Sequence, residues 1–363
     1  MMDIETDDYY ERIQQLRTAG MTFSAIAREL GVNRKTLYKF RQRFPVDYSP
    51  TDEELTDAVV RIKNENSHFG EVYVKGALRS QGLTVTRRRI RECIHRLAGE
   101  GIPIRLQPRL RRRAYVNPAN RYLFHLDGNE KLQMFSIYIL GCVDGFSRKV
   151  IYLKCSPNKK SETHLAHFSN AANQFGLPRF VRMDHGGENV LIEEFMHDNL
   201  HALGHERSVI YGSSVHNVRI ERFWGEVNDI TWRFKVLFYS MEMDGVLDSS
   251  NPLNLSCLHY VYLPRIQEAL DNFAQVWDCH GIRTAHHRSP NLMFLTGPHM
   301  PDYPITYPAR NYGNLEAEYN YPGDFLELAQ VIIPNPLLED NNQGVSLFQH
   351  LLHELNRYFT HIQ

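Results

Sequence analysis

Apolar residues recur at helical spacing through the first third of the chain. The first helices are predicted over 9–19, 23–30 and 34–44. Thr22 and Asn33 stand where N-terminal caps are expected, and Gly20 and Gly31 follow the first and second helices. Short helices joined by such tight turns are typical of a helix-turn-helix, which we assign to residues 1–46.

A second helical pattern follows a short proline-containing linker. Helices are predicted around 51–62, 72–78 and 87–97, with Thr51 and Thr86 as caps of the first and third. We interpret residues 51–100 as a second unit that resembles a helix-turn-helix. Residues 101–119 are rich in proline and arginine, and we interpret them as a basic linker.

The hydrophobic period changes from helical to extended at Arg121. Strands are predicted over 122–127, 134–143, 149–155, 180–184 and 208–211. The intervening and following helices are predicted over 161–175, 189–200 and 215–239. This order is that of an α/β ribonuclease H-like fold, with a mixed five-stranded sheet and flanking helices. The core occupies residues 120–300, and residues 301–363 form a C-terminal tail region.

The charge of the chain changes sign along its length. The 363 residues carry 41 Lys and Arg against 42 Asp and Glu, so the formal charge is −1. Residues 1–119 hold 22 basic and 15 acidic side chains, a balance of +7, and the remaining 19 basic and 27 acidic side chains give −8. The basic first part favours a polyanionic partner, because binding a phosphate backbone releases counterions. A solvated charged face is the alternative.

The basic side chains cluster on the predicted helices and in the linker. If the helical units contact DNA, the residues on their outer faces are the candidates. The alternatives are a purely structural three-helix bundle for the first unit and a basic solvated face for the second. The DNA-binding candidates are Arg34, Lys35, Tyr38, Lys39, Arg87, Arg88, Arg91, Arg111, Arg112 and Arg113.

Several classes of protein do not fit the sequence. No run approaches the roughly 18 apolar residues of a membrane helix, and the acidic N-terminus does not resemble a signal peptide. The five cysteines are odd in number and contain no Cys-x-x-Cys pair, which argues against a disulfide scaffold or a zinc ribbon. We therefore expect an intracellular protein that does not bind a membrane.

Three acidic residues occupy positions that suit metal binding. Asp127 and Asp184 each stand at the end of a predicted strand, where a carboxylate is accessible at the edge of a sheet. Glu221 lies at the margin of the apolar stripe of the long helix, on its polar side. Taken singly, each acid could be an ordinary turn or helix-surface carboxylate.

The segments around these acids resemble a known family. They are 125–129 (HLDGN), 143–148 (VDGFSR), 182–189 (RMDHGGEN) and 212–224 (GSSVHNVRIERFW). They are similar to segments of integrase core domain proteins, which are retroviral-integrase-like transposases and integrases of transposon origin. The resemblance extends over roughly residues 120–300, and it implies that Asp127, Asp184 and Glu221 form the catalytic and metal-binding triad of this family.

The resemblance implies a metal-dependent enzyme that cleaves and joins DNA strands. Three carboxylates can hold two Mg²⁺ or Mn²⁺ ions, because these hard cations prefer oxygen ligands. The implied partners are double-stranded DNA and further copies of the chain for paired-end joining, and the implied location is the nucleus. One alternative is a catalytically silent DNA-binding or interaction protein of transposon origin. Another is a nuclease that cuts without joining.

Overall fold

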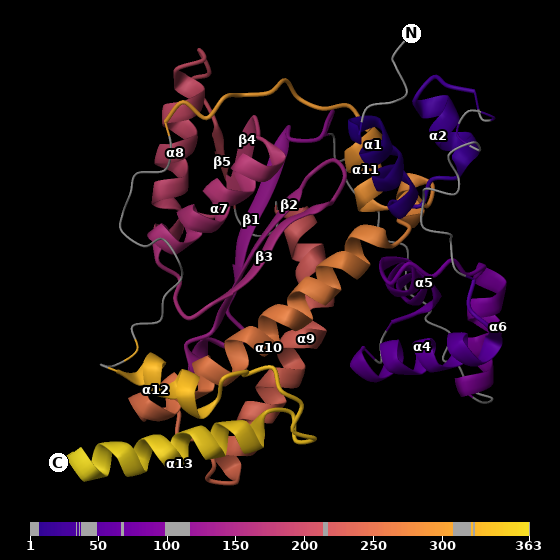
Figure 1. Cartoon of the computed structure of the whole chain (residues 1–363). Helices are drawn as coiled ribbons and strands as arrows, with labels where there is room; N and C mark the ends of the chain where they lie inside the picture. Colours follow the sequence, from indigo (N-terminus) through magenta and orange to yellow (C-terminus); the bar gives the residue numbers. More distant parts are fainter. Residues whose placement is uncertain are drawn as a thin grey trace. The chain divides into compact units, whose positions relative to one another are not determined.

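The computed structural model describes residues 7–33, 35, 37, 49–66, 69–98, 117–212, 217–307, 321 and 324–362. The chain divides into two compact units, shown in Figure 1. The first comprises 1–122, 145–149 and 274–299, and the second comprises 123–144, 150–273 and 300–363. The domain boundaries expected at residues 46, 100, 119 and 300 stay predictions.

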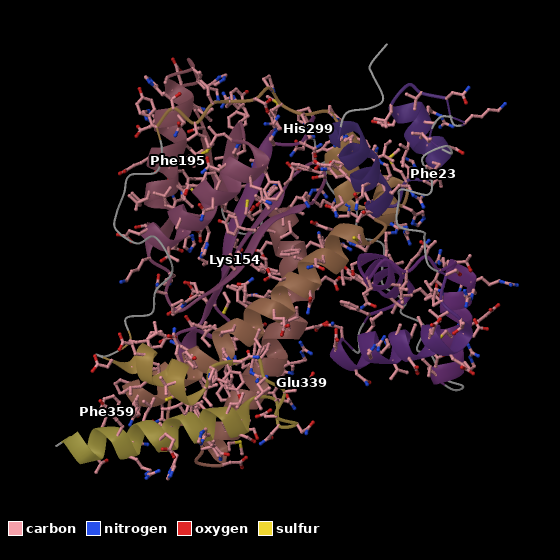
Figure 2. The ribbon with its side chains drawn as sticks, viewed as in Figure 1. Phe23, Lys154, Phe195, His299, Glu339 and Phe359 are labelled. Atoms are coloured by element: carbon pink, nitrogen blue, oxygen red, sulfur yellow. The ribbon has the colours of Figure 1, made fainter. Side chains whose placement is uncertain are left out.

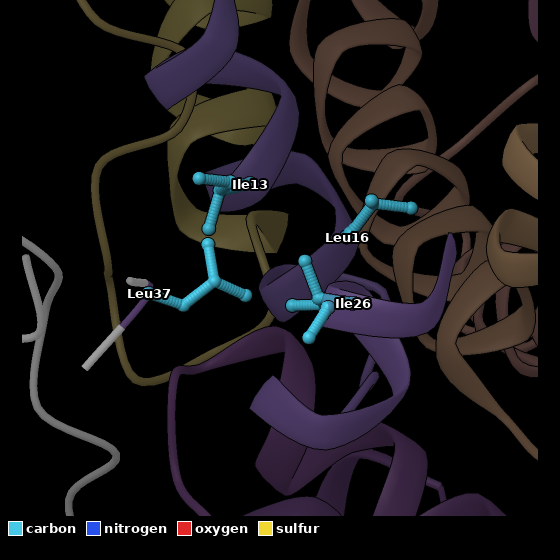
Figure 3. Close-up of a cluster of buried hydrophobic side chains, with 5 residues drawn as sticks. Ile13, Leu16, Ile26 and Leu37 are labelled. Atoms are coloured by element: carbon cyan, nitrogen blue, oxygen red, sulfur yellow. The ribbon is translucent and has the colours of Figure 1, made fainter. Parts of the chain in front are cut away.

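The N-terminal helices of the first unit are α1 (Asp7–Thr18) and α2 (Phe23–Glu29). The hydroxyl of Thr22 accepts a 3.2 Å hydrogen bond from the Ala25 amide, so the predicted cap of α2 is confirmed. A small core holds the two helices together, and Figure 3 shows four of its members labelled. These buried residues are Ile13, Leu16, Ile26, Ala27 and Leu37. Of the helix predicted over 34–44, only residues 35 and 37 lie within the described part of the chain.

The second helical group consists of α4 (Asp52–Glu65), α5 (Glu71–Ser80) and α6 (Arg87–Ala98). Thr51 caps α4 in a reciprocal capping box with Glu54, and the Thr86 hydroxyl accepts from the Arg89 amide at 3.4 Å. All three predicted helices are therefore present at nearly the predicted positions. Most of the predicted linker lies outside the described residues.

The second unit contains a five-stranded mixed sheet, as the sequence predicts. Its strands lie in the order β3-β2-β1-β4-β5; the first three are antiparallel, and β4 and β5 run parallel to β1. The strands are β1 (Leu123–Asn129), β2 (Tyr138–Asp144), β3 (Val150–Ser156), β4 (Phe180–Met183) and β5 (Val209–Tyr211).

The prediction that the second strand begins at residue 134 is wrong. Gln133–Phe135 forms a 3-10 turn, η2, and Ser136 adopts the left-handed conformation with φ of 53°. A left-handed residue reverses the chain direction locally and cannot continue a strand. The apolar run from Met134 therefore enters the sheet only at Tyr138.

Helices flank the sheet, with α7 and α8 on one side and α9 on the other in Figure 1. α7 ends at Gly176, whose φ of 90° favours glycine. Phe168 of α7 packs edge to face against Phe195 of α8, with 6.0 Å between ring centroids, and Phe195 is labelled in Figure 2. The helices are α7 (Ser161–Phe175), α8 (Val190–His201, after the 3-10 turn η3 at Gly187–Asn189), α9 (Val218–Met243) and α10 (Pro252–Cys279).

The C-terminal region adds α12 (Phe325–Ile332) and α13 (Val345–Ile362) to the second unit. Phe348, Leu351 and Leu355 are fully buried and follow each other at spacings of three and four, so α13 is an amphipathic helix packed by one face. The Tyr260 hydroxyl of α10 donates to the Ile333 carbonyl at 2.7 Å. Across the described residues, no helix combines the length and apolarity that crossing a membrane requires.

Candidate functional site

The register of the central strands brings two of the predicted acids to one end of the sheet. β1 and β4 are parallel, and His125 on β1 pairs with Arg182 on β4. Asp127 follows His125 by two residues, and Asp184 follows Arg182 by two residues. Asp127 lies within β1, and Asp184 directly follows β4. The carboxyl ends of neighbouring parallel strands are where an α/β sheet presents ligand-binding side chains.

Asp127 is half-buried and hydrogen-bonded through both carboxyl oxygens. Its Oδ1 accepts from the Gly128 amide at 3.0 Å, and its Oδ2 accepts from the Trp224 indole nitrogen at 2.8 Å. The pKa of Asp127 is raised to about 6, mainly by burial. The hydrogen bond from Trp224 lowers it, the negative charges of Glu221 and Asp184 raise it, and the Gly128 amide lowers it. Asp127 therefore lies within electrostatic reach of both Glu221 and Asp184.

Glu221 stands in the first turn of α9 and is exposed. Asp127 and Glu221 line the same pocket, which has a volume of about 620 Å³. Lys131 and Lys235 also line it, so two cationic side chains share the pocket with the two carboxylates. The other lining residues are Gly128, Asn129, Glu130, Gln133, Met134, Trp224 and Asn228.

Asp184 is exposed and its carboxylate is held by its own loop. Its Oδ1 accepts from the Asn189 side-chain amide at 2.9 Å and from the Gly186 backbone amide at 3.3 Å. Asn189 is buried at the end of the turn that precedes α8. Within the described residues, Asp184 is not part of the pocket that Asp127 and Glu221 line.

Polar contacts tie α9 to the face of β1 that carries Asp127. The amide of Asn217, the N-cap of α9, donates to the Leu126 carbonyl at 2.8 Å, and its oxygen lies 2.5 Å from His125 Nδ1. Further along, Asn129 donates to Asn228 at 2.9 Å. Residues 125, 127 and 129 share one face of the strand, and 217, 224 and 228 share one face of the helix.

Sequence reasoning assigned Trp224 to the apolar stripe of α9 and missed its bond to Asp127. The side chain is buried, with 5% exposed, as the stripe predicts. However, an indole ring also carries one N–H that needs an acceptor when buried. The signal was present in the spacing, because Trp224 follows Glu221 by three residues and therefore covers the same side of the helix.

The donor set suits a hard divalent cation. Asp127, Asp184 and Glu221 supply carboxylate oxygens only. The pKa of Asp127 is raised mainly by burial and further by the charges of Glu221 and Asp184, and a bound cation would offset both effects. Among the residues that the structure describes, no group of three His, Cys, Asp or Glu side chains lies close enough together to hold a metal ion.

The arginines of α6 that were predicted to contact DNA are engaged by acidic residues of the same unit. Arg87 and Arg91 both bind Glu71, at 2.8 and 2.7 Å, and the pKa of Glu71 is lowered to about 2, most of all by its bond to Arg91. Arg88 is 84% exposed and lies 3.6 Å from Glu92. All three guanidinium groups remain largely at the surface.

Of the other DNA-binding candidates, only Lys35 lies within the described part of the chain. Its side chain is exposed, and its backbone amide donates to the Asn33 side chain at 2.9 Å. The remaining candidates lie outside the described residues; they are Arg34, Tyr38, Lys39, Arg111, Arg112 and Arg113.

The mixed five-stranded sheet, in the order β3-β2-β1-β4-β5 with flanking helices, defines a ribonuclease H-like α/β protein. The family model described as "Integrase core domain" matches residues 114–300. The chain belongs to the integrase core domain family, as the resemblance predicts. No curated protein matches the sequence.

Two solved structures illustrate the similarity. One is the simian T-cell lymphotropic virus intasome in complex with PP2A regulatory subunit B56 gamma, with 17% identity over 69% of this chain and 77% of that chain and a TM-score of 0.38. The other is the HTLV-2 integrase catalytic core domain in complex with magnesium, in its trimeric form, with 13% identity over 47% of this chain and 95% of that chain and a TM-score of 0.30.

Proposed function

We propose that this protein is a DDE-type polynucleotidyl transferase that cleaves and joins DNA strands, with Asp127, Asp184 and Glu221 as its catalytic acids. The observation that carries the proposal is the placement of Asp127 and Glu221 in one pocket with Asp184 within electrostatic reach. Burial, with the charges of Glu221 and Asp184 in addition, makes Asp127 costly to keep charged, and a metal-binding role accounts for a carboxylate in this position.

Asp127, Asp184 and Glu221 would hold two Mg²⁺ or Mn²⁺ ions. When bound, the ions would activate a water or a 3′-hydroxyl as nucleophile and stabilise the leaving oxygen of the phosphodiester. The protein contributes the fixed positions of the acids: Asp127 is anchored on β1, Glu221 on the first turn of α9, and Asp184 by the Asn189 amide. Fixed ligands make the reaction faster because little reorganisation is needed.

Lys131 and Lys235 would bind phosphate groups of the DNA next to the acids. Both side chains line the pocket that contains Asp127 and Glu221. A lysine provides a cation that a phosphodiester can approach without exact alignment. The pocket therefore offers carboxylates for the metal ions and ammonium groups for the DNA backbone within one space.

The N-terminal helical units would recognise the DNA ends. This role is supported by the net positive charge of residues 1–119 and by the exposed guanidinium groups of α6. Joining two ends in one reaction requires two active sites, so we propose that the protein acts as a homo-oligomer. Chromosomal DNA as substrate would locate it in the nucleus.

The test is a strand-transfer assay with purified full-length protein. Short duplexes that carry the flanking ends of its own gene are incubated with Mg²⁺ or Mn²⁺, and products joined to a target duplex are separated by size. We expect joined product from the wild type and none from Asp184→Asn. Cleavage without joining would identify a nuclease, and DNA binding without any product above Asp184→Asn would identify a silent DNA-binding protein.

A further inference from the structure

Trp224 makes a specific polar contact at the acid site in addition to filling the core. Its indole Nε1–H donates to Oδ2 of Asp127 at 2.8 Å, and the side chain is only 5% exposed. Little water can reach an indole at this depth, so the N–H relies on the carboxylate as its acceptor. The orientation of the ring and that of the carboxyl group are therefore coupled.

Gly141 provides the space in which the indole lies. It stands directly opposite Asp127 in the antiparallel pairing of β1 and β2. A Cβ atom at Gly141 would lie 2.6 Å from Cη2 of Trp224, closer than carbon atoms can approach, and 3.1 Å from Cζ2. The ring therefore packs on bare backbone beside the strand pair, which lets its N–H reach Asp127.

The contacts of Asp127 fix the rotation of its carboxyl group. Oδ1 accepts from the Gly128 amide and Oδ2 accepts from the indole, so each oxygen has one donor among the residues that the structure describes. A carboxylate oxygen has two acceptor positions, which leaves one on each oxygen for another partner. The carboxyl group is therefore held in one orientation while it keeps the capacity to bind a cation.

We propose that Trp224 is a positioning residue that orients the Asp127 carboxylate for a divalent cation, with Gly141 making room for its ring. The inference rests on the proposed function, because it takes Asp127 to be a metal ligand. Residues that hydrogen-bond to a metal ligand typically affect affinity by about 10- to 100-fold. The Trp224 bond should act at the lower end of that range, because a backbone amide also holds Asp127.

The experiment measures Mn²⁺ binding to the full chain by the electron paramagnetic resonance signal of free Mn²⁺. Trp224→Phe keeps an aromatic ring and removes the N–H. Trp277→Phe is the matched control, because Trp277 is also 5% exposed and its indole donates at 2.8 Å, in this case to the Arg148 carbonyl. Thermal unfolding of both variants is recorded so that binding is measured where each is folded.

We expect Trp224→Phe to weaken Mn²⁺ binding about tenfold and Trp277→Phe to leave it unchanged. Gly141→Ala, which displaces the indole without altering it, should weaken binding in the same direction. Wild-type affinity in both Trp224→Phe and Gly141→Ala would overturn the inference and leave the proposed function standing, provided that Asp127→Asn loses binding. Wild-type affinity in Asp127→Asn would overturn the metal assignment and the inference together.

Discussion

The Nδ1 atom of His125 on β1 lies 2.5 Å from the side-chain oxygen of Asn217, the N-cap of α9. Because an amide oxygen only accepts, His125 donates through Nδ1. Burial lowers the pKa of His125 to about 4, so the ring is neutral at physiological pH. Asn217 also donates to the Leu126 carbonyl, and one side chain thus fixes the start of the helix that carries Glu221 against the strand that carries Asp127.

Replacing Asn217 by Ala should destabilise the protein by about 1–3 kcal/mol. The change removes the acceptor of the His125 N–H and the donor to the Leu126 carbonyl, both in a buried setting. Urea denaturation measures the effect. Asn342→Ala is the control, because Asn342 is exposed and its side chain bonds only at the surface. Equal stabilities of the two variants would contradict the structural role of Asn217.

The stability of the protein should fall as the pH is lowered from about 6.5 to 4. Burial lowers the pKa of four histidines to about 4; they are His125, His164, His167 and His259. The unfolded chain binds these protons near pH 6.5 and the folded chain does not, so acidification favours unfolding. At pH 5, each of these histidines should lower the free energy of unfolding by on the order of 1–2 kcal/mol.

Asp127 acts in the opposite direction. Its pKa is raised to about 6, mainly by burial, so its contribution stabilises the fold at acidic pH and is lost as the pH rises through 6. One such group against four histidines leaves a net loss of stability on acidification. Urea unfolding at pH 7.5 and pH 5 tests the prediction. His259→Gln should reduce the difference in the free energy of unfolding between the two pH values. Equal free energies of unfolding at the two pH values would refute it.

Breaking the Lys149–Asp278 ion pair by removing one partner should strongly destabilise the first unit. The two groups lie 2.7 Å apart, with 15% and 9% of their side chains exposed. Lys149→Ala removes this cation from a buried carboxylate and should cost about 3–5 kcal/mol. Arg88→Ala, which removes an exposed pair with Glu92, should change stability by about 0.5 kcal/mol or less. Similar denaturation midpoints for the two variants would contradict this ranking.

Replacing Glu71 by Gln should strengthen DNA binding if α6 faces DNA. Glu71 binds both Arg87 and Arg91. Glu71→Gln removes the negative charge, which releases both guanidinium groups for contacts with phosphates. We expect an increase in affinity of about threefold to tenfold and a steeper salt dependence. Glu92→Gln, beside Arg88, is the milder comparison. An unchanged salt slope in Glu71→Gln would show that this face of α6 does not contact DNA.

Most helices and strands could be predicted from the sequence because their signals are local, and their order then indicated the fold. Capping residues such as Thr22 and Thr51 and the glycine after α7 mark helix ends through short-range chemistry. The start of β2 was missed because Met134 and Phe135 look like strand residues, whereas the left-handed Ser136 stops the strand there. Such a backbone conformation at a non-glycine residue has no strong sequence signal.

Contacts between distant residues could not be predicted in the same way. The three acids were identified from their flanking segments, but the bond between Trp224 and Asp127 joins residues 97 positions apart. Likewise, the arginines of α6 looked available for DNA, and only the packing of α5 against α6 brings Glu71 to them. Such pairings depend on tertiary structure, which a helical or strand period does not encode.

The most direct test of the metal site is a crystal of the full chain soaked in Mn²⁺ and measured by anomalous diffraction. The account predicts manganese bound by carboxyl oxygens of Asp127 and Glu221 at about 2.0–2.6 Å, with Asp184 turned toward the same ion or its neighbour. It also predicts the loss of this density in Asp127→Asn crystals. Manganese bound at other residues, with none at Asp127 or Glu221, would contradict the central claim.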